Sequence, residues 1–226
     1  MRSAPLQRFV DKMNSLDRAV WVWCGDSITH GAVFTQGLRD YVELVEERVR
    51  HECKRFLHIF VNTAIQGNTT REIKDQFDWR VKRFQPDLFC LMIGMNDCKR
   101  EFNMDISEFR ANLEEIIERV RHETPAEVLI HTCCAAFLEQ MPERARYPEF
   151  MDAVRRVTAE QDIAVIDHHA QWEKVRLSDP KRFASWMANP YHPNGAGHWV
   201  FAERVLIELG IGPLKETPPP KSPSHA

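Results

Sequence analysis

The stretch Trp21-Val-Trp-Cys-Gly-Asp-Ser-Ile-Thr-His-Gly31 changes abruptly at Gly25 from apolar to small and polar residues. Residues 19–24 are rich in Val and Trp and predict a buried strand. Ser27 then lies just past the end of that strand, where the sheet fixes its backbone and its hydroxyl can meet a ligand. The stretch therefore predicts either a catalytic serine or a turn in which Asp26 or Ser27 caps the next helix.

Apolar strands and amphipathic helices alternate along the rest of the chain. Further strands are predicted at residues 57–61, 88–93, 127–132 and 163–166, and helices at residues 6–16, 37–49, 106–120 and 196–209. This alternation is typical of a parallel sheet with helices on both faces. The chain shows no internal repeat, so we expect one domain over residues 1–215 and a disordered, proline-rich tail over residues 216–226.

The predicted helices carry apolar stripes that should face the sheet. The residues expected to point inward are Leu38, Tyr41, Val42, Val45 and Val49, then Ile106, Phe109, Leu113, Ile116, Ile117 and Val120, and finally Trp199, Val200, Val205 and Leu206. Asp105 is expected to cap its helix, with Glu108 reaching back as in a capping box. Gly210 is expected to end the last helix.

Composition excludes several classes of function. The 226 residues are 43% hydrophobic and 28% charged, as expected for one soluble domain with a substantial core. The balance of 30 Lys and Arg against 33 Asp and Glu gives a net charge of -3, which provides no basic field for nucleic acid. Basic clusters such as residues 80–83 are interleaved with apolar residues and are expected to be solvated helix faces.

The chain shows neither a signal peptide nor an apolar run long enough to cross a bilayer. Its six cysteines include no C-x-x-C pair, and Cys24 and Cys90 fall within predicted buried strands. We therefore expect reduced, mostly structural thiols in a cytoplasmic protein that does not insert into membranes. The oligomeric state is open.

Polar or small residues follow three of the predicted strands. They are Ser27, Gly67 and Asn96, and the turn-forming stretch Asn189-Pro-Tyr-His-Pro-Asn194 presents His192 before the last helix. Parallel strands bring their carboxyl ends to one edge, where open sheets bind ligands. Acyl transfer needs such a set, namely a nucleophile, a base and donors aimed at an oxyanion.

Four blocks, Gly25-Asp-Ser-Ile-Thr29, Gly67-Asn-Thr-Thr70, Gly94-Met-Asn-Asp97 and His192-Pro-Asn194, resemble those of the SGNH (GDSL) hydrolase family of lipases and esterases. They occur in the family's order and spacing and cover nearly the whole chain. The resemblance implies a three-layer α/β/α sandwich of flavodoxin-like type with about five parallel strands. It also implies a serine hydrolase that acts on carboxylic esters without a cofactor.

Position by position, the resemblance makes Ser27 the nucleophile and His192 the general base. The oxyanion hole would consist of the backbone N–H groups of Ser27 and Gly67 and the side chain of Asn96. Among the family's substrates are acetylated sugars, lysophospholipids, thioesters and simple lipids, and the sequence does not discriminate among these small-molecule esters.

Asn189 departs from the family pattern, which has aspartate three residues before the histidine. An asparagine oxygen can accept a hydrogen bond from the imidazole but supplies no charge, and an asparagine NH₂ facing the ring selects the wrong tautomer. Three explanations are open. The enzyme works as a Ser-His dyad, another acceptor such as Asp179 or a backbone carbonyl replaces the carboxylate, or Asn189 is an introduced substitution.

Aromatic and histidine residues near these blocks allow more than one interpretation. Phe34, Trp186, Met187 and Tyr191 flank the predicted site and are candidates for an acyl or leaving-group pocket, although such aromatic residues are often only core. His30 is expected to be a solvated loop residue. His168 and His169, with His192 and His198, lack the helical pairing of a zinc motif, so no metal is expected.

The sequence leaves two other functions open for the whole chain. A catalytically impaired protein of the same fold that binds acylated ligands is supported by Asn189. A doubly wound nucleotide- or flavin-binding protein is disfavoured because the chain has neither G-x-G-x-x-G after its first strand nor G-x-x-x-x-G-K-[ST].

Overall fold

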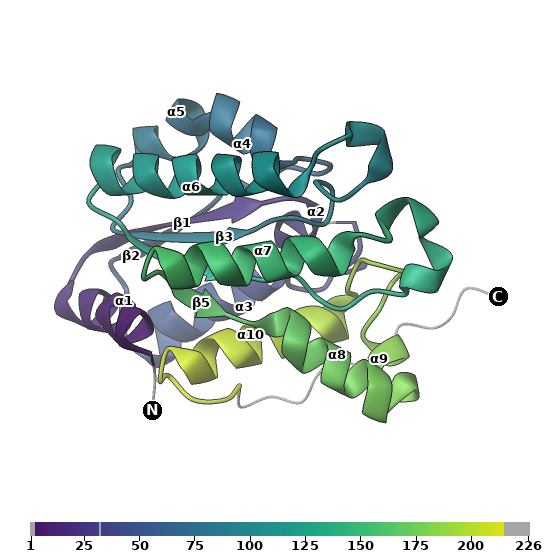
Figure 1. Cartoon of the computed structure of the whole chain (residues 1–226). Helices are drawn as coiled ribbons and strands as arrows, with labels where there is room; N and C mark the ends of the chain where they lie inside the picture. Colours follow the sequence, from purple (N-terminus) through teal and green to yellow (C-terminus); the bar gives the residue numbers. More distant parts are fainter. Residues whose placement is uncertain (1–2, 32, 215–226) are drawn as a thin grey trace.

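The computed structural model describes residues 3–31 and 33–214, and its centre is one sheet of five parallel strands (Figure 1). The strands are β1 (Ala19–Gly25), β2 (His58–Asn62), β3 (Leu88–Met92), β4 (Glu127–His131) and β5 (Ala164–Ile166). Their spatial order is β2-β1-β3-β4-β5. This is the flavodoxin-like order, so the fold class implied by the sequence is confirmed.

Strand β1 lies between β2 and β3 and is almost completely buried. Trp21 pairs in register with Phe60 of β2 and Leu88 of β3. Trp21 and Trp23 point to the same face, with their ring planes 3° apart, and the Trp21 indole N–H donates to His58 Nδ1 at 3.1 Å. Burial on both faces explains why this segment is a continuous apolar run rather than an alternating one.

Helices cover both faces of the sheet, as Figure 1 shows, with α4, α5, α6 and α7 on one side and α1, α3 and α10 on the other. The α-helices are α1 (Ala4–Ser15), α2 (Ser27–His30), α3 (Tyr41–Glu47), α4 (Thr70–Asp75), α5 (Phe77–Arg80), α6 (Ile106–Glu123), α7 (Tyr147–Glu160), α8 (His168–Ser178), α9 (Pro180–Ser185) and α10 (Gly195–Glu208). A π-helical turn, Arg48–Glu52, continues α3. The remaining short turns are 3₁₀-helical.

The predicted strands and long helices are confirmed, with two local corrections. The helix expected from residue 37 begins at Tyr41, because the Asp40 carboxylate accepts the N–H groups of Val42 and Glu43 and forms a capping box. Leu38 lies before that cap, and its side chain is exposed rather than inward. Glu108 does not reach back to its cap, because its carboxylate pairs with Arg71 instead.

The remaining helix predictions are largely confirmed. Asp105 caps α6 by accepting the Glu108 N–H, and the expected stripe of α6 is buried apart from the partly buried Ile106. In α10, Val200 is only partly buried, and Gly210 ends the helix with φ +77°. The predicted tail, residues 216–226, lies outside the described residues.

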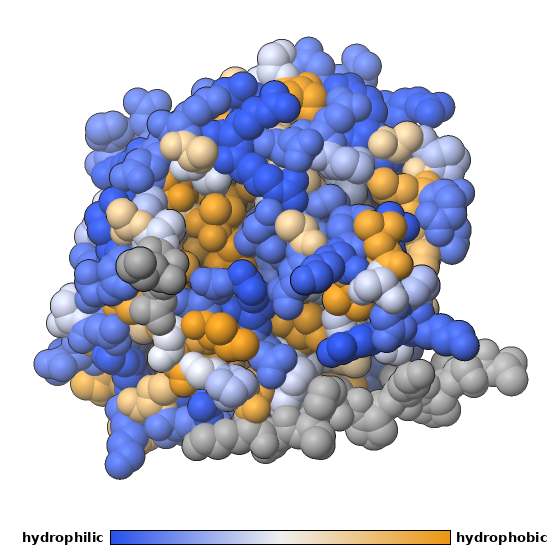
Figure 2. Space-filling model, turned by 60° about the horizontal axis from the view of Figure 1, so that its bottom comes forward, coloured by the Kyte–Doolittle hydropathy of each residue, from blue (hydrophilic) through white to orange (hydrophobic). Residues whose placement is uncertain are grey.

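The six cysteines are free thiols, five of them buried and Cys53 exposed, as expected. Among the described residues, no helix is long and apolar enough to cross a membrane. On the face seen in Figure 2, hydrophobic residues form separate patches between hydrophilic ones.

Gly25 ends β1 and pairs in register with Met92 of β3. A Cβ at this position would stand 2.4 Å from the Met92 carbonyl oxygen and 2.7 Å from Thr29 Oγ1. The backbone oxygen cannot move without separating two hydrogen-bonded strands, so only glycine allows this approach.

We expect Gly25→Ala to destabilise the fold. Overpacking of this kind costs about 1–3 kcal/mol, which corresponds to a fall of roughly 2–12 °C in Tm for a chain of this size. Thermal unfolding followed by circular dichroism measures the shift, with Lys181→Ala on the exposed surface of α9 as the control. An unchanged Tm would contradict the close approach of the Met92 carbonyl to residue 25.

Candidate active site

The carboxyl edge of the sheet brings together residues that are far apart in the chain. Ser27 is the first residue of α2, and the Asp26 carboxylate before it accepts the Ile28 N–H, so Asp26 does cap the helix. His192 precedes α10, whose N-cap Asn194 accepts the N–H groups of Ala196 and Gly197. Ser27 Oγ lies 2.7 Å from His192 Nε2, although the two residues are 165 positions apart.

Asn189 occupies the position beside the other ring nitrogen of His192. Its Oδ1 accepts the backbone N–H groups of His192 at 2.8 Å and Tyr191 at 3.1 Å. Only an oxygen can accept both N–H groups, so the orientation of this amide is fixed. The Nδ2 atom consequently faces His192 Nδ1, at 2.9 Å, with Oδ1 further away at 3.2 Å.

This arrangement disfavours the imidazole tautomer that a general base needs. An NH₂ group that donates to Nδ1 leaves the ring proton on Nε2, where it points to Ser27 Oγ. Burial, together with the smaller effect of the nearby Arg144 guanidinium, lowers the pKa of His192 to about 4. Because Asn189 is neutral, the imidazolium lacks the stabilising negative charge that an aspartate at this position would supply.

Asp179, an alternative acceptor considered from the sequence, lies elsewhere. Its carboxylate accepts the Arg182 N–H and caps α9. The contacts at His192 Nδ1 within the described residues come from Asn189.

Two of the four flanking side chains contact the imidazole. The Phe34 ring stacks on His192 with centroids 3.4 Å apart and planes 8° apart, and the Tyr191 ring lies 4.2 Å away. Trp186 instead packs edge-to-face against Trp172 in the core. Met187 is partly buried and bridges to Pro193 within the histidine turn.

The candidate oxyanion donors lie on adjacent loops. Gly67 has φ +79° and is exposed, and nothing lies within 4 Å of where a Cβ would be. Asn96 Nδ2 donates to the Asn68 carbonyl at 3.0 Å, which ties the loop after β3 to the Gly67 loop. Ser27, Asn96 and His192 expose only 6%, 6% and 4% of their surfaces, so a substrate can approach over a small area.

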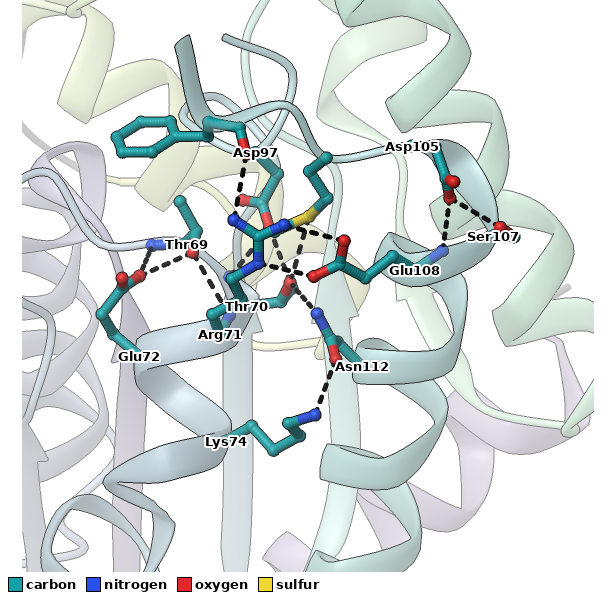
Figure 3. A network of polar contacts seen from close by, with 12 residues as sticks. Thr69, Thr70, Arg71, Glu72, Lys74, Asp97, Asp105, Ser107, Glu108 and Asn112 are labelled. Carbon is teal, nitrogen blue, oxygen red and sulfur yellow. Dashed lines mark hydrogen bonds and ion pairs between the residues drawn. The ribbon is translucent and has the colours of Figure 1, made fainter. Parts of the chain in front are cut away.

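A polar network holds the start of α4 against α6 beneath these loops (Figure 3). Asp97 Oδ1 accepts from both the backbone N–H and the hydroxyl of Thr70, and Asn112 of α6 donates to the same hydroxyl. Beside them, Arg71 of α4 pairs with Glu108 of α6. The network fixes where the Gly67 loop leads into α4.

Two buried carboxylates lie in this region. Desolvation raises the pKa of Asp26 to about 7 and that of Asp97 to about 6, and the charge of Asp97 adds to the effect on Asp26. One oxygen of each, Oδ2, has no hydrogen-bond partner.

The other histidines that the sequence suggested as metal ligands are buried. His168 contacts His131 at 3.2 Å between ring nitrogens, and His198 Nδ1 accepts the Tyr41 N–H. His30 is exposed at the end of α2. Across residues 3–31 and 33–214, no three His, Cys, Asp or Glu side chains are grouped so as to hold a metal ion.

Sequence reasoning missed Arg80, and its assignment to a solvated face is wrong. Only 1% of Arg80 is exposed. The signal was present, because Phe77, Arg80, Val81 and Phe84 recur at helical spacing and place Arg80 on an apolar stripe.

Comparison with known proteins matches this geometry to a family. The family model of the GDSL-like lipase/acylhydrolase family matches residues 24–200, which is more than half of the chain. An acetylxylan esterase of Geobacillus stearothermophilus is 25% identical over 159 residues, covering 67% of this chain and 72% of that protein. An uncharacterized protein of Mycoplasma pneumoniae is 26% identical over 161 residues, and the match spans 62% of this chain and only 18% of that protein.

Solved structures show the same fold. A crystal structure of a catalytic mutant of the Geobacillus acetylxylan esterase aligns with TM-score 0.73 and 22% identity over 88% of this chain and 97% of that one. A putative GDSL-like lipase of Parabacteroides merdae aligns with TM-score 0.73 and 17% identity over 85% of this chain and 96% of that one. The chain therefore belongs to the GDSL-like lipase/acylhydrolase family and is an ester-hydrolysing enzyme.

Proposed function

We propose that this enzyme is a serine esterase that forms an acyl-enzyme on Ser27. The observation that carries the proposal is the 2.7 Å contact between Ser27 Oγ and His192 Nε2. Ser27 Oγ attacks the ester carbonyl, His192 accepts its proton, and the same proton then passes to the leaving alcohol. A water molecule activated by His192 releases the acid and restores the serine.

In this proposal the developing oxyanion is held by the N–H groups of Ser27 and Gly67 and by the Asn96 amide. The hydrogen bond from Asn96 to the Asn68 carbonyl supports it, because it places that amide beside the Gly67 loop. Gly67 is exposed, has φ +79° and carries no Cβ, so a ligand can approach its backbone closely.

Asn189 holds the position of the third triad residue in this proposal. Crystal structures exist of catalytic mutants of the Geobacillus esterase that carry alanine in place of a serine, an aspartate and a histidine three positions after that aspartate. The same spacing separates Asn189 from His192. With a neutral amide at Nδ1, each turnover starts from the less stable Nδ1–H tautomer, so we expect a slow enzyme.

For the substrate, we propose an ester with an acetyl or other short acyl group. The catalytic side chains are nearly buried, and Phe34 stacks over the imidazole, so little room is left for a long chain. The activity named for the Geobacillus relative, acetylxylan esterase, agrees with an acetyl group.

A second candidate function is the binding of acylated ligands with little or no turnover. The NH₂ of Asn189 facing His192 Nδ1 favours it, because that contact opposes proton transfer from the serine. Labelling by a fluorophosphonate distinguishes the two, since only a serine activated by a base reacts at an appreciable rate.

We expect Ser27→Ala to abolish hydrolysis of p-nitrophenyl acetate and labelling by a fluorophosphonate, because both need the serine oxygen. Initial rates and gel fluorescence measure the two effects. Retained turnover in Ser27→Ala would assign the chemistry to another residue, and a wild-type protein that binds esters but is never labelled would favour the binding function.

We expect Asn189→Asp to raise kcat. One carboxylate oxygen would keep the two backbone N–H groups, and the other would replace Nδ2 at 2.9 Å from His192 Nδ1, where it accepts the ring proton. The reverse exchange lowers kcat about 10⁴-fold in serine proteases, which sets the upper limit of the gain. Asp179→Asn, which keeps the cap of α9, is the matched control and should leave kcat unchanged.

The pH profile of kcat/KM should move with the same substitution. A base with a pKa of about 4 stays unprotonated to low pH, so the acid limb of the wild-type profile should lie near pH 4. A carboxylate beside the ring stabilises the imidazolium and raises that pKa, so the limb of Asn189→Asp should move to higher pH. Identical acid limbs for both proteins would contradict the assignment of His192 as the base.

A further inference from the structure

Arg80 is a buried cation that hydrogen-bonds three residues at the carboxyl edge of the sheet, in the end of β1 and in the loop between β2 and α4. Its Nη2 donates to the Gly25 carbonyl at 3.1 Å and, with Nε, to the Thr63 carbonyl at 2.8 and 3.0 Å. Its Nη1 donates to Asn68 Oδ1 at 2.6 Å. Gly25 ends β1, Thr63 follows β2, and Asn68 lies next to Gly67.

These acceptors are all neutral oxygens, as far as the described residues show. A guanidinium 1% exposed loses its hydration, and a buried cation without a carboxylate partner is costly unless hydrogen bonds satisfy it. The planar fork of arginine can reach several carbonyl groups at fixed angles, which the point charge of lysine cannot. The contacts of Arg80 therefore define the relative position of the segments that they join.

These two segments carry two of the proposed oxyanion donors, the N–H groups of Ser27 and Gly67. Gly25 lies two residues before Ser27. Asn68 follows Gly67, and the Asn68 carbonyl accepts the Asn96 amide at 3.0 Å, so the chain of contacts continues to the third donor. The Ile65 N–H also donates to the Gly25 carbonyl, at 3.1 Å, so this oxygen is shared by the loop and by Arg80.

We propose that Arg80 is a positioning residue that holds the donors from Ser27, Gly67 and Asn96 in the geometry that stabilises the oxyanion. This inference rests on the proposed function of those donors. Arg80 acts through Gly25, Thr63 and Asn68 and does not touch the substrate. Displacement of such donors by about 0.5 Å is enough to weaken catalysis, because their value depends on preorganisation.

Substitution of Arg80 should lower kcat rather than raise KM. We expect Arg80→Met to reduce kcat on p-nitrophenyl acetate by about 10- to 100-fold with KM changed by less than about threefold, since a lost oxyanion donor costs about 10²–10³. Arg80→Lys keeps the charge but loses the fork, and should recover only part of the rate. Arg48→Met removes another buried arginine, in the π-helical turn that continues α3, and should lower Tm without lowering kcat.

The truncated variant Arg80→Ala allows chemical rescue. Arg80 lines an open cleft of about 340 Å³ together with His30, Trp79 and Phe84. Free guanidinium at millimolar concentration can enter the space left by the side chain, and it should raise the kcat of Arg80→Ala but not that of Arg48→Met. A kcat of folded Arg80→Met within twofold of the wild type would overturn the proposal.

Asn68→Ala tests the same contacts without removing the buried cation. Asn68 is only partly buried, so this variant should fold, and the loss of the Arg80 contact should again lower kcat selectively. An unchanged kcat in Asn68→Ala would contradict the connection from Arg80 to the Gly67 loop.

Hydrogen exchange provides a readout that does not depend on activity. In Arg80→Met, exchange of the Ile65 N–H, which is bonded to the Gly25 carbonyl, should accelerate more than tenfold, while that of Leu91 in β3 stays unchanged. Unchanged exchange at Ile65 would refute the positioning role even in a protein without turnover. If Ser27→Ala loses turnover and Arg80→Met keeps normal turnover, the esterase proposal stands and only the positioning role of Arg80 is refuted.

Discussion

Parallel pairing of β1 between β2 and β3 is the constraint on which the rest of this structure depends. The strand order reverses at β1, because β2 lies on one side of it and β3, β4 and β5 on the other. The helices that follow β1 and β2 consequently pack on opposite faces of the sheet. The loops after β1, β2 and β3 therefore meet at one edge, and Ser27, Gly67 and Asn96 are located by the backbone of the sheet rather than by flexible segments. Gly25 makes this close pairing possible, because it has no Cβ to meet the Met92 carbonyl.

The five strands and four of the helices could be predicted, because β1 and β3 are continuous apolar runs and α6 has a nearly complete apolar stripe. The helices α2, α4, α5, α7, α8 and α9 were not predicted individually. The meeting of Ser27 and His192 followed from family spacing, and the structure brings them into contact. What sequence could not give was the orientation of side chains. The direction of the Asn189 amide depends on the two backbone N–H groups of a turn, and no pattern in the chain reports it.

Arg80 and Glu108 illustrate a different limit. Both have polar side chains whose partners lie in distant segments, so local rules gave the wrong answer for each. Arg80 was assigned to solvent because charged residues usually lie there, and Glu108 was assigned to a cap because its spacing fitted one. In the folded chain, each side chain contacts a segment that is distant in the sequence. Arg80 contacts the end of β1 at Gly25, and Glu108 contacts helix α4.

The turn around Asn189 has an evolutionary consequence. Its Oδ1 holds the backbone of the histidine turn, a task that a carboxylate oxygen performs equally well, while the stacked Phe34 fixes the plane of the imidazole by van der Waals contact. The contacts that hold His192 are thus independent of the charge at residue 189. Asparagine and aspartate codons differ by one nucleotide in the first position, so a complete Ser-His-Asp triad and the present neutral site are separated by one point mutation across a backbone that suits both.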